Sequence, residues 1–370
     1  MAVNTSGATI HMLPFTSRFG NSSGIGNDNR TAIDDFYNIN DEDIIENKEF
    51  RYPVFVPGTG KKYKRAILLL HGLNERSWLK YLPWGYYLAI KTGVPVILFP
   101  IAFHMNRSPQ MWSNPRAVMP LLIRRNHSVA RASMTTIANV ALSERLSEDP
   151  LRFMLSGWQS AEDVICLLEQ TKSGKHPFLE KNADIDLFTY SIGSFLGQIL
   201  MLANPANLLQ QSRMFLFCGG SLFSQMNGVS RLIMDETAFR KIYHFYMCDL
   251  QTQIRQRHPF FVHLQQTSLG NAFISMIRES NRRTFREHTI AKLHDKIQAI
   301  CLKNDSVIPA TGIIQTLGIH GKPPFCNVEV FDPPFPYSHE TPFPVANPGL
   351  SPLVDTAFAH VFEKASGFLN

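Results

Sequence analysis

Short apolar runs without polar interruptions recur along this chain. The segment "AILLLHG" at residues 66–72 ends at a glycine, and "VPVILFPIAF" at 94–103 and "SRMFLFCGG" at 212–220 have the same character. Continuous apolar runs of this length are typical of strands that are covered on both faces. We expect further strands at 50–57, 184–191, 297–303 and 327–332.

Segments in which apolar residues recur at helical spacing lie between these runs. Gly93 follows the first of them and Asn204-Pro205 follows another, as helix stop signals do. The stretch 106–120, with three prolines, is expected to be a loop. Strands that alternate with helices predict the α/β class, with a mostly parallel central sheet and helices on both faces. The expected helices cover 80–93, 128–146, 156–170, 192–205 and 353–369.

The alternation is interrupted in one long segment. About 77 residues separate Gly220 from Ile297, far more than the connection between neighbouring parallel strands needs. Their composition suits helices, so we expect a helical cap insertion at about 221–294, with 104–150 as a candidate addition to it. Residues 1–47 are polar and then acidic, and we expect an N-terminal extension, partly mobile, of which some apolar residues dock on the core.

The composition narrows the class of protein. Of 370 residues, 44% are hydrophobic and 18% charged, as in a globular protein, and the net charge of +6 without a long Lys/Arg run indicates no nucleic-acid partner. Five cysteines without a CxxC pair are expected to be free thiols in a reducing compartment. Because the N-terminus lacks a signal-peptide pattern and no apolar stretch approaches ~18 residues, we expect a cytoplasmic protein without stable membrane insertion.

Motifs for cofactors and metals are missing from the sequence. No G-x-G-x-x-G follows the first strand, HExxH is absent, and no Cys/His cluster has the spacing of a zinc site. We therefore expect neither a cofactor nor a metal ion.

The segment "LFTYSIGSFLGQ" at 187–198 contains the strongest chemical signal. A serine between a strand and a helix can occupy a nucleophile elbow, a tight strained turn that needs small residues two positions before and after it. Gly193 meets this requirement, and Thr189 stands where glycine is usual. The alternatives are that Ser191 only caps the helix, or that Ser194 or Ser221 is the reactive hydroxyl.

A serine nucleophile requires a base and an orienting acid, in the order Ser, Asp or Glu, His along this type of chain. Asp305 follows the strand at 297–303, and His339 follows the last strand. Three alternatives stay open: Asp305 caps the next helix, Asp332 is the acid, or His339 is an ordinary loop histidine.

The same chemistry requires backbone donors for an oxyanion. The residue after the nucleophile, Ile192, supplies one amide, and the loop after an earlier strand supplies the second, which we assign to Leu73 in "HGLN". Other side chains and backbone groups expected near the carboxyl ends of the strands are candidate substrate contacts: His71, Gly72, His104, Asn106 and Arg107. Aromatic residues at 239–246 are either core or the lining of an acyl pocket.

The runs "LLLHG", "TYSIG", "KNDSVIP" and "YSHE" together resemble the α/β-hydrolase superfamily over about residues 48–370, apart from the inserted helices. The combination of "HGLNERSWLKYLPW" with "FCGGSLF" also resembles a bacterial family of unknown function. The resemblance implies an α/β-hydrolase fold and a serine hydrolase that acts on a small acyl substrate, most simply a carboxylic ester. In that case Ser191 is the nucleophile, His339 the general base and Asp305 its orienting acid.

Two other functions stay open at this point. The same fold and the same three side chains serve thioesterases and acyltransferases. A protein of this fold can also bind a ligand or partner without turnover.

Overall fold

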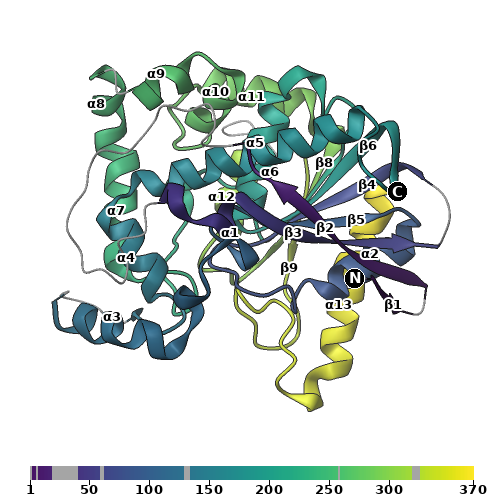
Figure 1. Cartoon of the computed structure of the whole chain (residues 1–370), viewed down its shortest axis with the longest axis horizontal. Helices are drawn as coiled ribbons and strands as arrows, with labels where there is room; N and C mark the ends of the chain where they lie inside the picture. The colour runs from purple at the N-terminus through teal and green to yellow at the C-terminus, as the bar shows by residue number, and fades with distance from the viewer. Residues whose placement is uncertain are drawn as a thin grey trace.

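A computed structural model of the chain describes residues 2–5, 7–18, 41–58, 62–128, 134–256, 259–318 and 326–370. Within these ranges the chain forms a nine-stranded sheet in the order β1-β2-β3-β5-β4-β6-β7-β8-β9 (Figure 1). The strands are β1 Ala2–Thr5, β2 Ala8–Thr16, β3 Glu49–Pro57, β4 Tyr63–Leu70, β5 Val96–Phe99, β6 Leu179–Tyr190, β7 Met214–Phe217, β8 Ile297–Leu302 and β9 Asn327–Phe331.

The six strands from β5 to β9 in this order run parallel, and β1, β2 and β3 pair antiparallel. Leu70 at the end of β4 is opposite Thr189 on β6, and Phe217 at the end of β7 is opposite Ile300 on β8. The carboxyl ends of these strands therefore meet at one edge of the sheet. The mostly parallel sheet predicted from the sequence is confirmed.

The central strand β4 shows how the sheet is covered on both faces. Ala66 to Leu70 are completely buried. Leu68 and Leu70 pack into the core beneath helices α5 (Leu151–Lys172) and α6 (Ile192–Ala203). Ile67 and Leu69 pack into the core beneath α2 (Leu82–Thr92) and α13 (Ser351–Leu369). A strand without polar alternation is the expected result when both faces are covered.

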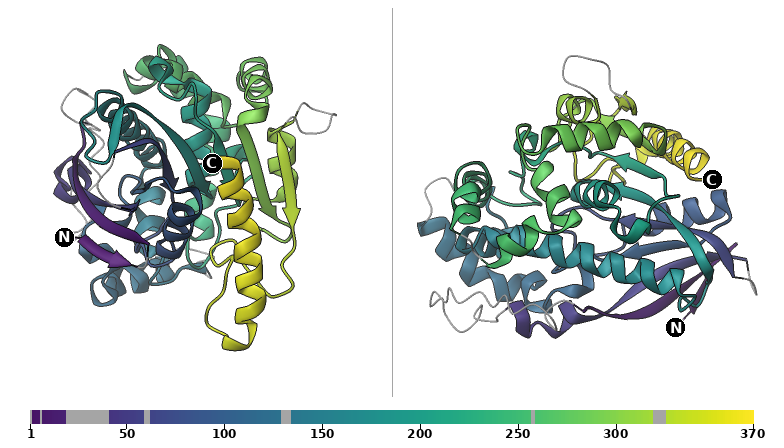
Figure 2. Two further views of the ribbon diagram at one scale, coloured as in Figure 1. Left: turned by 90° about the vertical axis from the view of Figure 1, so that its right-hand side faces the viewer. Right: turned by 90° about the horizontal axis from the view of Figure 1, so that it is seen from above.

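Helices cover both faces of this sheet, as expected (Figure 2). The described helices are α1 Ile45–Lys48, α2 Leu82–Thr92, α3 Pro115–Ser128, α4 Val140–Glu148, α5 Leu151–Lys172, α6 Ile192–Ala203, α7 Glu236–His244, α8 Leu250–Arg255, α9 Pro259–Gln265, α10 Ser268–Ser275, α11 Arg283–Lys292, α12 Ala310–Thr316 and α13 Ser351–Leu369. In Figure 1, α8 to α11 lie together above the sheet, and α7, α4 and α3 follow down its left side.

Two local expectations were wrong, both for physical reasons. Residues 106–120 were expected to be a loop, but α3 begins at Pro115, where the missing N–H of proline costs the helix nothing. The helix expected over 128–146 begins only at Val140, and residues 129–133 of that prediction lie outside the described residues.

The N-terminal extension contributes two strands to the sheet. Thr9 and Phe15 on β2 are opposite Val56 and Phe50 on β3, and β1 adds a further strand at the edge. The buried ring of Phe15 packs on Phe50 and Phe99, with ring centroids 5.1 Å apart in each pair. This part of the extension is therefore ordered. The acidic segment of the expected extension lies partly within 19–40, which is outside the described residues.

Candidate active site

Ser191 occupies the sharp turn between β6 and α6. Its backbone angles are φ 57° and ψ −124°, a left-handed φ that is strained for a residue with a side chain. Its N–H donates to the carbonyl of Phe217 on β7, at 3.2 Å, which holds the turn against the neighbouring strand. A Cβ at Gly193 would lie 2.5 Å from the carbonyl oxygen of Leu70, so only glycine fits there. The turn has the features of a nucleophile elbow.

Thr189, which stands where such turns usually have glycine, is accommodated by a glycine on the facing helix. The Thr189 side chain is fully buried, and a Cβ at Gly197 on α6 would lie 2.8 Å from its Cγ2. Its hydroxyl donates to Ser194 Oγ at 3.1 Å, with the Phe215 carbonyl 3.2 Å away. The added bulk on the strand is therefore matched by a missing side chain on the helix.

Ser191, His339 and Asp305 form a continuous chain of hydrogen bonds. Ser191 Oγ lies 2.6 Å from Nε2 of His339, whose Nδ1 lies 2.7 Å from Oδ2 of Asp305. All three side chains are buried, at 5% exposure or less. The second carboxylate oxygen of Asp305 accepts the N–H groups of Val307 and Ile308, at 2.8 and 2.9 Å. The carboxylate is thus fixed by its own loop, with one oxygen left for the imidazole.

The loop that carries His339 is anchored on both sides of the imidazole. The hydroxyl of Tyr190, the residue before Ser191, donates to the backbone carbonyl of His339, and the two rings stack with centroids 5.7 Å apart. The next residue, Glu340, accepts a hydrogen bond from Ser230, which lies beyond β7. Lys80 donates to the carbonyl of Glu340 at 3.3 Å. These contacts fix the position of the imidazole relative to Ser191.

Two backbone amides beside Ser191 are available to a ligand. The N–H groups of Leu73 and Ile192 have no hydrogen-bond acceptor within the described part of the chain. Gly72 differs, since its N–H donates to the hydroxyl of Tyr81 at 3.0 Å. The residues that carry the two open amides line one cavity together with Ser191. Two N–H groups beside a nucleophile are the usual means of stabilising an oxyanion.

The cavity in front of Ser191 has a volume of about 420 Å³ and apolar walls. Most residues that line it follow β7 in the sequence. Among them, the sequence pointed only to Phe239, as one of the aromatic residues at 239–246. The lining residues other than Leu73, Ser191 and Ile192 are Phe153, Phe223, Met226, Gly228, Ile233, Met234, Phe239, Ile242, Val307 and Ile308.

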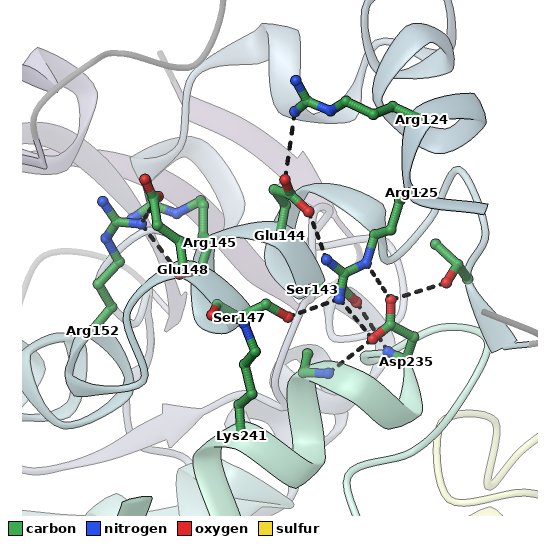
Figure 3. A network of polar contacts seen from close by, with 12 residues as sticks. Arg124, Arg125, Ser143, Glu144, Arg145, Ser147, Glu148, Arg152, Asp235 and Lys241 are labelled. Atoms are coloured by element: carbon green, nitrogen blue, oxygen red, sulfur yellow. Dashed lines mark hydrogen bonds and ion pairs between the residues drawn. The ribbon is translucent and has the colours of Figure 1, made fainter. Parts of the chain in front are cut away.

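An ion-pair network holds the wall of this cavity in place (Figure 3). Arg125 on α3 contacts both carboxylate oxygens of Asp235, at 2.5 and 2.9 Å, and Glu144 on α4 at 2.6 Å. Asp235 caps α7 by accepting the N–H of Ala238 at 2.9 Å. Phe239 on α7 lines the cavity, so the network connects α3 and α4 to the helix that shapes the binding space.

We expect the contribution of Asp235 to stability to disappear at low pH. Burial by itself raises the pKa of Asp235, but the hydrogen bonds from Arg125, Ala238 and Thr135 and the charge of Arg125 together outweigh it, and the net pKa is lowered. A carboxyl with a lowered pKa stabilises the fold above its unfolded value, about 3.9, and loses that contribution as the pH falls through its folded value.

Asp235→Asn keeps an oxygen for the helix cap and removes the charge. In urea unfolding, its deficit in free energy of unfolding against the wild type should be constant from pH 7 to about pH 5 and shrink below about pH 4. The exposed Asp249 offers a control, because Asp249→Asn should cost less than about 1 kcal/mol at any pH. A deficit for Asp235→Asn that persists undiminished to pH 3 would contradict the assignment.

His71 and Gly72 do not reach the cavity, so their expected role as substrate contacts is wrong. His71 is completely buried, with Nδ1 2.8 Å from the Gly72 carbonyl and Nε2 accepting the N–H of Ile101 at 2.9 Å. Burial lowers the pKa of His71 well below its ordinary value, so the ring is neutral. Both nitrogens are occupied in holding the loop before Leu73, which is the role of His71.

Asn106 and Arg107 are also structural. Arg107 is fully buried and donates to Asp163 at 2.7 Å and to the carbonyl of Asn47 at 2.9 Å. It therefore joins α1 to α5 and cannot contact a substrate. Asn106 is exposed, and its amide donates to the carbonyl of Arg51. His104, the remaining candidate, lines a second cavity together with the loop after Leu73.

Two further features of the described residues bear on the kind of protein. No group of three or more His, Cys, Asp or Glu side chains there is arranged to hold a metal ion. None of the described helices combines the length and the apolar character needed to cross a membrane.

The sheet order, the antiparallel strand beside a parallel run, and the serine turn between the central strand β6 and its helix define an α/β-hydrolase fold. This is the fold predicted from the sequence. The chain belongs to the family described as "Family of unknown function (DUF6051)", which matches residues 13–370.

Comparison with other proteins yields only remote similarity. No curated protein sequence matches the chain. A cold-adapted esterase from an Arctic intertidal metagenomic library is 10% identical, with 100% of this chain and 97% of that one covered and a TM-score of 0.41. Carboxyl esterase 2 of the mycorrhizal fungus Tuber melanosporum is 12% identical, with coverages of 87% and 82% and a TM-score of 0.46. A thermostable esterase from Pseudomonas putida is 10% identical, with coverages of 100% and 85% and a TM-score of 0.44. Similarity this remote carries no argument about activity.

Proposed function

We propose that this protein is a serine hydrolase that cleaves carboxylic esters through an acyl-enzyme intermediate. The observation that supports it most is the hydrogen-bonded series from Ser191 through His339 to Asp305, buried at the base of an apolar cavity. A histidine that only stabilised the fold would not need a carboxylate on one nitrogen and a strained serine on the other.

The first half of the reaction forms the acyl-enzyme. Ser191 Oγ attacks the ester carbonyl carbon while its proton passes to Nε2 of His339, and Asp305 stabilises the imidazolium through Nδ1–H. The negative oxygen that forms accepts hydrogen bonds from the N–H groups of Leu73 and Ile192. His339 then returns the proton to the leaving alcohol as its C–O bond breaks.

The second half releases the acid. A water molecule gives a proton to Nε2 of His339 and attacks the acyl carbon, which passes through a second oxyanion at the same two amides. The bond to Ser191 Oγ then breaks, and the serine recovers the proton from His339. The products are a carboxylic acid and the regenerated enzyme.

We further propose that residues of about 221–294 act as a cap domain on the hydrolase domain of 48–370, with α3 and α4 as its support. The side chains beyond β7 supply the apolar wall in front of Ser191, and Arg125 connects α3 to the start of α7. In this arrangement the cap selects the acyl group, and the sheet supplies the reacting groups.

The experiment that tests the proposed function is a series of neutral p-nitrophenyl esters with acyl chains of increasing length. We expect turnover that rises with chain length while the acyl group fits the apolar cavity and falls beyond it. The folded protein failing to hydrolyse any member of the series would contradict the proposal.

Gly228 offers a direct test that the cavity holds the acyl chain. A Cβ at this position would lie 3.0 Å from Cδ2 of Phe239 and 3.3 Å from Cε of Met234, both in the cavity wall. Gly228→Ala should push these side chains inward and lower the ratio of kcat/KM for long over short acyl esters by about tenfold. Gly367→Ala, where a Cβ meets open space, is the matched control and should leave the ratio unchanged. An unchanged ratio in Gly228→Ala would place the acyl chain elsewhere.

A further inference from the structure

The loop that follows Leu73 lines a second cavity, of about 390 Å³. We call it the Arg76 cavity. Its walls include Asn74, Glu75, Arg76, His104, Trp112 and Arg145. Because Arg76 is three residues from Leu73, their Cα atoms are at most about 11 Å apart. Leu73 lines the cavity at Ser191 and the next residue, Asn74, lines the Arg76 cavity, so the two cavities lie close together.

The charged groups of the Arg76 cavity do not balance. Arg145 is paired with Asp41 at 2.8 Å and lies over the ring of Trp112, 4.1 Å from its centroid. Glu75 is paired with Lys80. Arg76 donates only to the carbonyl of Ala138, and no carboxylate of the described residues lies within ion-pair distance of it. One positive charge is left over.

The environment of Arg76 makes this charge available to a ligand. The guanidinium is partly buried, and this desolvation lowers the pKa of Arg76 without any compensating carboxylate. A partly desolvated cation with no partner gains more from a bound anion than a fully hydrated one. Because a single charge is unbalanced and Glu75 stands beside it, the site favours a monoanion over a dianion such as phosphate.

His104 adds a neutral acceptor to the wall of the cavity. Its Nδ1 lies 2.8 Å from the carbonyl oxygen of Ala102 and donates to it, so Nε2 carries the lone pair. Nε2 is buried and has no hydrogen-bond partner among the described residues. Burial lowers the pKa of His104 to about 4, and the ring is uncharged at neutral pH. His104 therefore adds no charge, and Arg76 alone determines the preference for an anion.

We propose that the Arg76 cavity binds a carboxylate of the substrate, so that the enzyme prefers esters that carry a second, free carboxylate group. The proposal rests on the function proposed above, because it assumes that the ester lies at Ser191. The acyl chain of such a substrate occupies the cavity lined by α7, and the alcohol side of the ester carries the carboxylate that pairs with Arg76. An acyl ester of a short hydroxycarboxylic acid is the simplest compound with this chemistry.

The test uses full-length Ser191→Ala protein, which binds ligand without turnover, and two probes that differ by one charge. Calorimetric titration at low ionic strength compares 4-(hexanoyloxy)butanoate, a monoanion, with its neutral methyl ester. We expect the monoanion to bind at least about tenfold more tightly. Equal affinity for the two probes would overturn the proposal without any further variant.

Two variants in the Ser191→Ala background assign the preference to one residue. Arg76→Gln should remove it, and Arg76→Lys should keep part of it, since the charge remains while the planar guanidinium is lost. Arg240→Gln is the matched control, because Arg240 is exposed on α7 and pairs only with Glu236. It should keep the full preference. A preference that survives in Arg76→Gln would also overturn the proposal.

The two proposals fail in different ways. If neutral esters are hydrolysed but Ser191→Ala binds both probes equally, the carboxylate site is wrong and the hydrolase stands. If Ser191→Ala prefers the monoanion but the wild type hydrolyses no ester, neutral or charged, the carboxylate site stands and the proposed function is wrong.

Discussion

Replacing Ser191 with alanine will lower kcat for a p-nitrophenyl ester by about 10⁶-fold, the scale of loss when a serine nucleophile is removed from such a site. The hydroxyl bonds only to His339 in the described structure, and the side chain fills no core position. The melting temperature should therefore change by no more than a few degrees, which circular dichroism will show.

Ser194→Ala is the matched control for this prediction. Ser194 is buried one helical turn after Ser191, and its hydroxyl accepts a hydrogen bond from Thr189 instead of reaching the imidazole. This variant should keep most of its activity and lose some stability, by about 1 kcal/mol. Strong residual activity in Ser191→Ala, or a loss of activity in Ser194→Ala alone, would show that Ser191 is not the nucleophile.

Replacing Asp305 with asparagine will lower kcat by about 10⁴-fold with little change in KM. The carboxamide oxygen can still accept the N–H groups of Val307 and Ile308, so the loop keeps its structure. The carboxamide nitrogen would then face Nδ1 of His339, where two donors cannot pair. The ring must take the tautomer with its proton on Nε2, which cannot accept the proton of Ser191.

Asp332→Asn is the control that separates the two candidate acids. Asp332 is exposed and pairs with Lys303 at 3.0 Å, and Asn304 and Tyr337 also donate to it. We expect its loss to change kcat by less than about threefold, since exposed pairs contribute less than about 1 kcal/mol. Equal losses in the two variants would remove the reason for choosing Asp305.

Sequence patterns were sufficient where short segments determine structure. The runs that became β4, β5 and β7 are apolar because both of their faces are covered, and this is visible in the sequence itself. The spacing of Ser191, Asp305 and His339 relative to the strands predicted their place at one edge of the sheet. Parallel strands bring such residues together whatever the intervening sequence.

The sequence could not predict features that depend on distant partners. Arg107 follows a strand end and was taken for a substrate contact, but its partner Asp163 lies 56 residues away. Thr189 departs from the usual turn, and its match, Gly197, is recognisable only when the helix is placed against the strand. Arg76 was overlooked because its significance is a missing counter-ion, which only the packed structure reveals.

Most residues that line the cavity in front of Ser191 were not predicted, for a similar reason. Its lining comes from segments between 153 and 308 that meet only after folding, and each residue taken alone is an ordinary apolar side chain. Apolar residues at helical spacing predict burial, but they do not distinguish a core from the wall of a cavity. Of the cavity wall, Ser191 and the amides of Leu73 and Ile192 were predictable from their positions after the strand ends, and Phe239 only as either core or pocket lining.

The most direct test of Ser191 as the nucleophile is the mass of the intact protein after reaction with a fluorophosphonate, followed by peptide mapping. Such probes bond covalently to a serine that a neighbouring base activates and an oxyanion site assists. We expect one adduct per chain, on Ser191, that is absent in Ser191→Ala and much slower to form in Asp305→Asn. Folded wild-type protein that forms no adduct, or forms it on another residue, would contradict the assignment of Ser191 as the nucleophile.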